Sequence, residues 1–170
     1  MALTDYIRNI PDFPKPGIQF KDITPLLQDP GALKEVIQLL AEPYRANPVD
    51  YVVGIESRGF IFGAPLAMAL GVGFVPIRKP GKLPAETLSA TYELEYGTDE
   101  IQIHKDAIQP GQSVAMVDDL LATGGTMSAA CDLINRLDAN IVGISFLIEL
   151  AFLEGRARLM DQDIHALITY

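Results

Sequence analysis

Two carboxylates and a run of small residues stand side by side in the middle of the chain. Asp118 and Asp119 directly follow the apolar run 114–117, which is typical of a buried strand. A loop of small and hydroxyl residues comes next: Ala122, Thr123, Gly124, Gly125 and Thr126. Apolar residues then recur at helical spacing: Met127, Ala130, Cys131, Ile134 and Leu137. A strand, a glycine loop and a helix in this order predict an anion site, because the first turn of a helix has unpaired N–H groups and a positive dipole end.

The two carboxylates indicate what else the ligand carries. A carboxylate beside a phosphate would repel it, so we expect Asp118 and Asp119 to accept hydrogen bonds from sugar hydroxyls, directly or through a metal ion and its waters. Thr123 and Thr126 add hydroxyl donors to loop amides, which can form an anion-binding nest. A phosphate next to a diol suggests a ribose 5-phosphate.

Two better-known phosphate motifs are excluded. A Walker loop needs lysine and then serine or threonine after its second glycine, but Gly125 is followed by Thr126 and Met127. The run 71–73 begins like a dinucleotide fingerprint, yet Pro76 occupies the position of the third glycine.

Basic residues gather in two further segments of an otherwise acidic chain. Ser57 and Arg58 follow the apolar run 51–55, and Arg78, Lys79 and Lys82 follow the run 74–77. An arginine fork and lysine ammonium groups suit a pyrophosphate and the charge that grows on it as it leaves. A solvated basic turn is the alternative for residues 78–82, and the nearby glycine loop weakens that alternative.

Apolar strands alternate with helices along the chain. We expect strands at 51–55, 74–77, 114–117, 141–148 and 164–168. One helix is expected to begin at Asp29 and Pro30 and to end near Pro43 or Tyr44. Its expected buried residues are Leu33, Val36, Ile37, Leu39 and Leu40. A second helix is expected at 60–70. This alternation predicts an α/β fold with a doubly wound, mainly parallel sheet and helices on both faces. Ligands bind at the carboxyl ends of such strands, so one crevice is expected to hold Arg58 and Asp118.

Two segments depart from the alternation. Residues 79–112 alternate polar and apolar residues in two stretches, like a small hairpin, and we interpret them as a mobile lid over the site. Residues 1–28 show little periodicity and are expected to form an irregular cap. Neither segment resembles a separate domain, so residues 1–170 are expected to form a single domain.

Composition narrows the classes of partner. The chain has 170 residues, 49% of them hydrophobic, and a formal net charge of −9, which argues against nucleic acid or an anionic membrane as the main partner. No apolar run reaches the ~18 residues of a membrane span, and the first residues lack the apolar core of a signal peptide, so we expect a cytoplasmic protein. Cys131 is expected in the core. His104 and His165 are interpreted as structural or surface residues.

The motifs resemble those of a known family. Residues 118–126 are similar to the signature with which type I phosphoribosyltransferases bind 5-phosphoribosyl-1-pyrophosphate. Residues 12–27, 56–60, 77–84 and 92–97 resemble, in the same order, further hallmarks of the adenine-specific members. The resemblance covers nearly the whole chain. It implies the type I phosphoribosyltransferase fold, with residues 1–28 as a base-binding hood and 79–112 as a flexible β-hairpin lid.

The resemblance also implies a reaction and its partners. Adenine and phosphoribosyl pyrophosphate would give AMP and pyrophosphate in purine salvage, with Mg²⁺ carried by the substrate diphosphate and with no direct protein ligand. Phe20 would stack on the purine, and main-chain groups near Gln19 and Lys21 would read its edge and reject 6-oxopurines. Lys21 departs from the arginine that is usual in the family. An ordinary core or lid aromatic is the alternative for Phe20. The family is usually a homodimer.

The family mechanism passes through a ribosyl cation. Ser57 would help to bind the pyrophosphate. Positive side chains would stabilise it as it departs, some of them across a dimer interface: Arg58, Arg78, Lys79 and Lys82. Of these, Arg58 and Lys82 would be catalytic. Glu95 matches the lid glutamate of the family and is the candidate acid/base. An exposed hairpin edge, shared with Glu93, is the alternative for Glu95.

Two other functions stay open at this point. The first is a phosphoribosyltransferase for another purine base, such as hypoxanthine or xanthine. The second is a non-catalytic regulator that senses phosphoribosyl pyrophosphate. The acidic charge and the ~28 residues before the first expected helix disfavour a regulator with an added DNA-binding domain.

Overall fold

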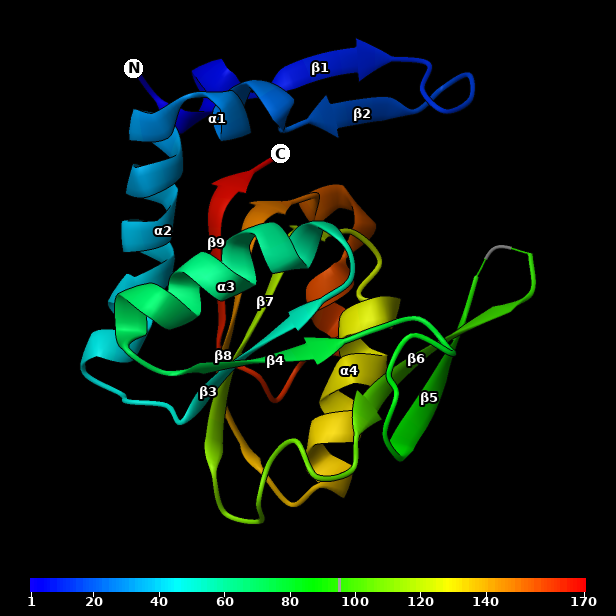
Figure 1. The fold of residues 1–170 in the computed structure, drawn as a ribbon. Helices are drawn as coiled ribbons and strands as arrows, with labels where there is room; N and C mark the ends of the chain where they lie inside the picture. Colours follow the sequence, from blue (N-terminus) through cyan, green and yellow to red (C-terminus); the bar gives the residue numbers. More distant parts are fainter. Residues whose placement is uncertain (95) are drawn as a thin grey trace.

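A parallel sheet forms the centre of the fold in the computed structural model, which describes residues 1–94 and 96–170 (Figure 1). Within these residues the sheet has five strands in the order β4-β3-β7-β8-β9. Their bounds are β3 Tyr51–Ile55, β4 Gly73–Ile77, β7 Ser113–Leu121, β8 Asn140–Glu149 and β9 Ile164–Thr169. All four neighbouring pairs run parallel. The predicted α/β class and doubly wound sheet are confirmed.

Helices cover both faces of the sheet. The helices α2 (Pro30–Arg45) and α3 (Arg58–Leu70) pack on one face, and α4 (Gly125–Arg136) packs on the other. In β7, Val114 and Met116 join the core beneath α4, while the alternate residues Ala115 and Val117 join the core beneath α2 and α3. A strand that is buried on both faces carries a continuous apolar run, which is why the strands were recognisable from sequence.

Helix α2 begins as predicted. The side chain of Asp29 accepts a hydrogen bond of 2.8 Å from the N–H of Ala32, which satisfies one of the unpaired donors of the first turn. The predicted burial of Leu39 is wrong, because 39% of this residue is exposed. The helix also continues through Pro43 to Arg45.

Strand β7 extends further than predicted. We expected it to end before Asp118, but it continues to Leu121, so both aspartates belong to the strand. The reason is that β8 continues to pair with β7 up to Leu121, whereas β3 pairs with it only as far as Val117. The aspartates therefore stand where β7 has lost one of its two neighbours.

The N-terminal segment is more regular than the irregular cap that we expected. It contains the 3-10 turn η1 (Leu3–Tyr6), the strands β1 (Arg8–Pro11) and β2 (Gln19–Asp22), and the short helix α1 (Thr24–Gln28). The two strands form an antiparallel hairpin, called here the hood hairpin. Figure 1 shows it beyond α3, at the end of the molecule where β9 finishes.

The segment 79–112 contains the predicted hairpin, made of β5 (Thr87–Glu93) and β6 (Thr98–His104). Its base is part of the core under α4, because Ala90, Ile101 and Ile103 are buried there. Arg136 of α4 donates a hydrogen bond of 2.6 Å to the carbonyl of Ser89. The base is therefore fixed, and mobility of the tip stays a prediction.

Three smaller predictions concern single residues. Cys131 is buried as a free thiol, and its burial raises the pKa of the thiol to about 12. The side chain of His104 accepts a hydrogen bond from the N–H of Ala85, and the ring of His165 lies within hydrogen-bond distance of Asp163.

The 3-10 turns η2 (Ala151–Leu153) and η3 (Gly155–Arg158) connect β8 to β9. Searched over residues 1–94 and 96–170, the chain has no helix with both the length and the apolar character needed to span a bilayer.

Candidate active site

A cavity of about 300 Å³ opens at the carboxyl ends of β3 and β7. Six of the predicted site residues line it: Ser57, Arg58, Lys79, Asp118, Asp119 and Thr126. The expectation that one crevice holds the loop after β3 and the loop after β7 is confirmed. Glu56 and Tyr92 line it as well, and the sequence analysis assigned neither of them a role.

The predicted phosphate loop encloses a second, smaller pocket of about 80 Å³. Its walls are residues 122–126, together with Asp118, Leu120, Leu121 and Met127. Within the described part of the chain, no side chain caps α4 at Gly124, so its first N–H groups are available to a ligand. Asp118 and Thr126 line both pockets. A phosphate in the loop and a group in the larger cavity would therefore be neighbours.

Two glycines fix the shape of this loop. Gly124 has a φ of +85°, and a Cβ atom there would lie 2.5 Å from the carbonyl oxygen of Gly155. A Cβ atom at Gly155 would in turn lie 2.5 Å from the carbonyl oxygen of Ala122. Gly155 could not be predicted from the sequence, because its contact with the loop depends on how the chain returns after β8.

A third glycine brings α3 against the aspartates. A Cβ atom at Gly59 would lie 2.9 Å from Oδ1 of Asp118, so only glycine allows the start of α3 to approach β7 this closely. The neighbouring Arg58 then forms an ion pair with Asp119, with 2.7 Å between Nε and Oδ2. The predicted pyrophosphate residue and the predicted ribose residue are thus joined.

The two aspartates do not share one electrostatic environment. Burial and the negative charge of Asp119 raise the pKa of Asp118 well above the ordinary range of a carboxyl group, against a smaller opposite effect of Arg58. Oδ1 of Asp118 also accepts a hydrogen bond of 2.9 Å from the N–H of Asp119. Asp118 therefore holds a proton more readily than an ordinary carboxylate, while Asp119 is paired with a guanidinium.

The carboxylate of Glu56 lies close to two of the predicted basic residues. Its carboxylate accepts a hydrogen bond of 2.7 Å from Nε of Arg78 and lies 3.9 Å from Nζ of Lys82. As far as the described residues go, the walls of the 300 Å³ cavity include Lys79 but neither Arg78 nor Lys82. The peptide bond between Glu56 and Ser57 is cis.

The predicted base-binding residues lie on the hood hairpin, next to the cavity. The ring of Phe20 has the guanidinium carbon of Arg58 5.7 Å from its centroid, and it makes an edge contact with Phe13 at a centroid distance of 5.1 Å. Phe20 is thus adjacent to a residue that lines the cavity.

The side chains of Gln19 and Lys21 are engaged elsewhere. Both bond to Asn9, at 2.8 Å and 3.1 Å, and Nζ of Lys21 lies 4.0 Å from the ring centroid of Tyr170. Their side chains therefore alternate with that of Phe20 along β2. Recognition of a base by main-chain groups near these residues stays a prediction.

Glu95, the candidate acid/base, lies outside the described residues. The described residues on either side, Leu94 and Tyr96, are 49% and 86% exposed. Glu93 is exposed at the end of β5.

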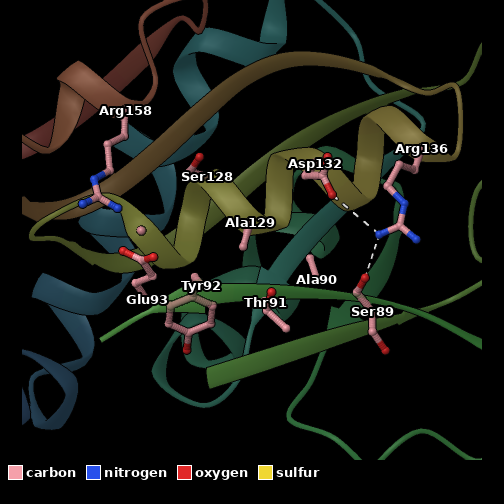
Figure 2. A pocket seen from close by; sticks show the side chains of 11 residues that line it. Ser89, Ala90, Thr91, Tyr92, Glu93, Ser128, Ala129, Asp132, Arg136 and Arg158 are labelled. Atoms are coloured by element: carbon pink, nitrogen blue, oxygen red, sulfur yellow. Dashed lines mark hydrogen bonds and ion pairs between the residues drawn. The ribbon is translucent and has the colours of Figure 1, made fainter. Parts of the chain in front are cut away.

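A larger groove of about 500 Å³ lies between β5 and α4 (Figure 2). Figure 2 shows Arg158 and Arg136 at its two ends, with Asp132 paired to Arg136 at 3.6 Å. Of the predicted site residues, Gly125 alone lines it among the residues described. Volume therefore does not identify the site, whereas the convergence of predicted residues does.

Two of the carboxylates around the cavity are engaged by cationic side chains. Among residues 1–94 and 96–170, no group of three His, Cys, Asp or Glu side chains is placed to hold an ion. Asp119 and Glu56 are already paired with cationic side chains. These residues fit a Mg²⁺ ion that arrives on substrate phosphates and keeps several waters.

Comparisons with known proteins identify the family of the chain. Residues 22–169 match the model of the phosphoribosyl transferase domain family. The chain is 60% identical over 168 residues to an adenine phosphoribosyltransferase of Halothermothrix orenii, covering 99% of each chain.

Solved structures show the same architecture. Adenine phosphoribosyltransferase of Thermoanaerobacter pseudethanolicus is 56% identical with a TM-score of 0.95, covering 99% of this chain and 98% of its own. The Saccharomyces cerevisiae protein, solved with an imino-altritol bisphosphate and adenine, is 46% identical with a TM-score of 0.93, covering 97% and 96%. The chain therefore belongs to the phosphoribosyltransferase family, and within it to the adenine phosphoribosyltransferases.

Proposed function

We propose that the chain transfers the 5-phosphoribosyl group from phosphoribosyl pyrophosphate to N9 of adenine, giving AMP and pyrophosphate. The observation that carries this proposal is the sharing of Asp118 and Thr126 between the pocket of the glycine loop and the cavity of the basic residues. One ligand with a phosphate at one end and a diphosphate at the other fits both. The adenine of the yeast complex supports the base.

The substrate would extend across the ends of β3 and β7. The 5-phosphate would bind the loop Ala122, Thr123, Gly124, Gly125 and Thr126, and the ribose hydroxyls would face Asp118 and Asp119. The diphosphate, with its Mg²⁺, would face Ser57, Arg58 and Lys79, with Arg78 and Lys82 reaching it after they leave Glu56. Adenine would stack on Phe20, beside the Arg58 guanidinium.

The reaction then needs charge stabilisation and a proton acceptor. The bond from C1 of the ribose to the diphosphate oxygen breaks, its electron pair leaves with pyrophosphate, and N9 of adenine forms the new bond and loses its proton. Arg58 and Lys82 would stabilise the leaving group, because fixed positive charges act most strongly where negative charge develops. Glu95 would accept or relay the proton on the purine.

Family membership supports two further expectations. A homodimer would allow basic residues of one subunit to reach the site of the other, and a purine salvage enzyme would act in the cytoplasm. Sedimentation of the purified protein across a dilution series tests the first of these. A monomer that forms AMP at full rate would exclude a need for the dimer.

The direct test is nucleotide formation from each base with phosphoribosyl pyrophosphate and Mg²⁺. We expect AMP from adenine and a specificity for adenine over hypoxanthine of about 10⁴, because 6-oxopurines leave buried polar groups unpaired. Phe20→Ala should raise the KM for adenine, with Phe20→Tyr, which keeps the aromatic ring, as the matched control. IMP formation at a comparable rate, or no nucleotide at all, would overturn the proposal.

A further inference from the structure

Lys79 has two partners on the hairpin, and neither belongs to the site predicted from the sequence. Its ammonium forms an ion pair with Asp99 of β6 and donates a hydrogen bond of 2.9 Å to the hydroxyl of Tyr92 of β5. That hydroxyl donates in turn to Oδ2 of Asp99 at 3.1 Å. Tyr92 and Asp99 face each other across the hairpin as register partners. The three groups close a ring of hydrogen bonds, named here the Lys79 triad.

The triad leaves one donor of the ammonium for a ligand. A lysine ammonium has three N–H groups, and Asp99 and Tyr92 take two of them. Lys79 and Tyr92 both line the 300 Å³ cavity, together with Arg58 and Asp118. The geometry therefore holds the ammonium at the cavity wall and restricts the directions that its third N–H can take.

Charge keeps the triad together. Partial burial acts to lower the pKa of Lys79, but the hydrogen bonds to Asp99 and Tyr92 outweigh this effect and raise that pKa. The hydrogen bond from Lys79 lowers the pKa of Asp99, as does a bond of 2.8 Å from the N–H of Glu100. Both groups are therefore charged at neutral pH. The bond to Glu100 also orients the carboxylate from its own strand.

The hairpin that carries the triad is anchored. Ala90 and Ile101, which pair across β5 and β6, are buried in the core under α4. Arg136 holds the carbonyl of Ser89 at 2.6 Å. Figure 2 shows Tyr92 on the strand that faces α4, with its hydroxyl directed away from Arg158 and Glu93. Tyr92 and Asp99 pair two positions beyond Ala90 and Ile101 toward the turn, so the triad lies close to the anchored part of the hairpin.

We propose that Asp99 and Tyr92 are positioning residues that hold the Lys79 ammonium toward the diphosphate of phosphoribosyl pyrophosphate. The inference rests on the proposed function, since it assigns the diphosphate to the cavity that Lys79 lines. A lysine on four flexible bonds loses rotamer freedom when it binds an anion, and two fixed partners remove part of that loss in advance. Asp99 and Tyr92 thereby make the hairpin part of substrate binding.

The variants Asp99→Asn and Tyr92→Phe test the proposal through separate atoms. Each should raise the KM for phosphoribosyl pyrophosphate about tenfold and weaken its binding with Mg²⁺ by the same factor in calorimetry. The KM for adenine should not change. The matched control is Glu86→Gln, because Glu86 forms an ion pair of 3.0 Å with Lys105 beside the same hairpin and lies outside the cavity lining.

A double-mutant cycle separates positioning from general structure. Lys79→Met should itself weaken phosphoribosyl pyrophosphate binding, and Asp99→Asn should add nothing in that background, because its effect passes through the ammonium. Equal effects in both backgrounds would overturn the proposal. So would tighter binding by Asp99→Asn, which would make Asp99 a competitor of the substrate. If the wild-type chain forms no AMP, the proposed function fails; if it forms AMP and Asp99→Asn behaves like Glu86→Gln, only the triad fails.

Discussion

At the scale of single residues, two features define the site. Some backbone contacts are too close to allow any side chain, and cationic side chains are already paired with carboxylates. Gly124, Gly59 and Gly155 each stand where a Cβ atom would come within 3.0 Å of a neighbouring atom. Arg58 and Lys79 each have a carboxylate partner before any substrate binds. The loop and the cations therefore have defined positions in the free protein.

The two glycines of the phosphate loop should respond differently to substitution. A Cβ atom at Gly125 would meet nothing closer than 3.5 Å. A Cβ atom at Gly124 would meet a carbonyl oxygen at 2.5 Å, and the backbone of residue 124 has a positive φ that side chains disfavour. Gly124→Ala should lower the free energy of unfolding by about 2 kcal/mol or more. Gly125→Val should leave it within about 1 kcal/mol and abolish binding of phosphoribosyl pyrophosphate. Urea unfolding and calorimetry measure the two effects, and unchanged affinity in Gly125→Val would exclude this loop as the phosphate site.

Lys82 should matter for turnover and not for stability. Its side chain is 51% exposed and its partner atom on Glu56 is 3.9 Å away, so the pair contributes little to folding. Because the Lys82 ammonium is proposed to stabilise the leaving pyrophosphate, Lys82→Ala should lower kcat about 100-fold. Adenine binding should be retained. Lys105→Ala serves as the control for loss of one surface lysine. A kcat within twofold of the wild type would remove Lys82 from the mechanism.

Residue types were predictable from the sequence, and their pairing was not. The loop 122–126, Arg58 and Lys79 were recognisable because anion chemistry needs those residue types after a strand. Nothing in the sequence indicated that Asp99, twenty residues after Lys79, would hold its ammonium. Such pairings depend on where the hairpin docks on α4. The role of Glu95 stays a prediction.

At the scale of elements, an ion pair fastens the segment after β8 to the sheet. Arg156 of η3 holds the last residue of β8, Glu149, through two bonds of 2.8 Å. These bonds lower the pKa of Glu149, although its burial acts to raise it. Gly155, which supports the phosphate loop, is the neighbour of Arg156.

Breaking this pair should change how stability depends on pH. Because the pKa of Glu149 is lower in the folded than in the unfolded chain, its contribution is present above about pH 4.3 and disappears as the pH falls through the folded value. Arg156→Gln should destabilise the fold by about 1–2 kcal/mol at pH 7 and by less at pH 3. Urea unfolding at the two pH values measures this. Arg45→Gln, at an exposed pair with Glu42, is the control.

The presence of each strand in the central sheet was predictable from the sequence. The length of a strand depended on the strands that pair with it. The strand 51–55 matched its predicted bounds, since both of its faces are covered and its apolar run is complete. Strand β7 continued through two aspartates because β8 accompanies it, which overrides the polarity of those residues. The hood hairpin was missed because its strands are short and contain no fully buried residue, so they lack an apolar pattern.

At the scale of the whole molecule, substrate should stabilise parts that are distant in sequence. Phosphoribosyl pyrophosphate would touch the loops after β3 and β7 and, near Tyr92, the hairpin, while adenine would add the hood. Phosphoribosyl pyrophosphate with Mg²⁺ at 100 times its Kd should add about 2.7 kcal/mol to the free energy of unfolding and raise the Tm by about 5–10 °C. Differential scanning calorimetry measures this, with Gly125→Val as the matched control. No shift at concentrations that support turnover would contradict a site that joins these parts.

The overall architecture was the part of the fold that could be predicted best from the sequence. A regular alternation of apolar strands and amphipathic helices determines a doubly wound sheet, and such a sheet places ligands at one edge. The contribution of the hairpin base to that edge was not predictable, because it depends on the docking of Ile101 and Ile103 under α4.

The contact between Gly124 and Gly155 has a consequence for synthesis on the ribosome. The phosphate loop is translated well before the segment that backs it, and β8 must pair with β7 to bring Gly155 into place. A nascent chain that has emerged only past α4 thus contains the residues of the phosphate loop but lacks the Gly155 segment that supports the loop. Tight substrate binding is therefore expected only after the residues up to Gly155 have been translated and have folded against the loop.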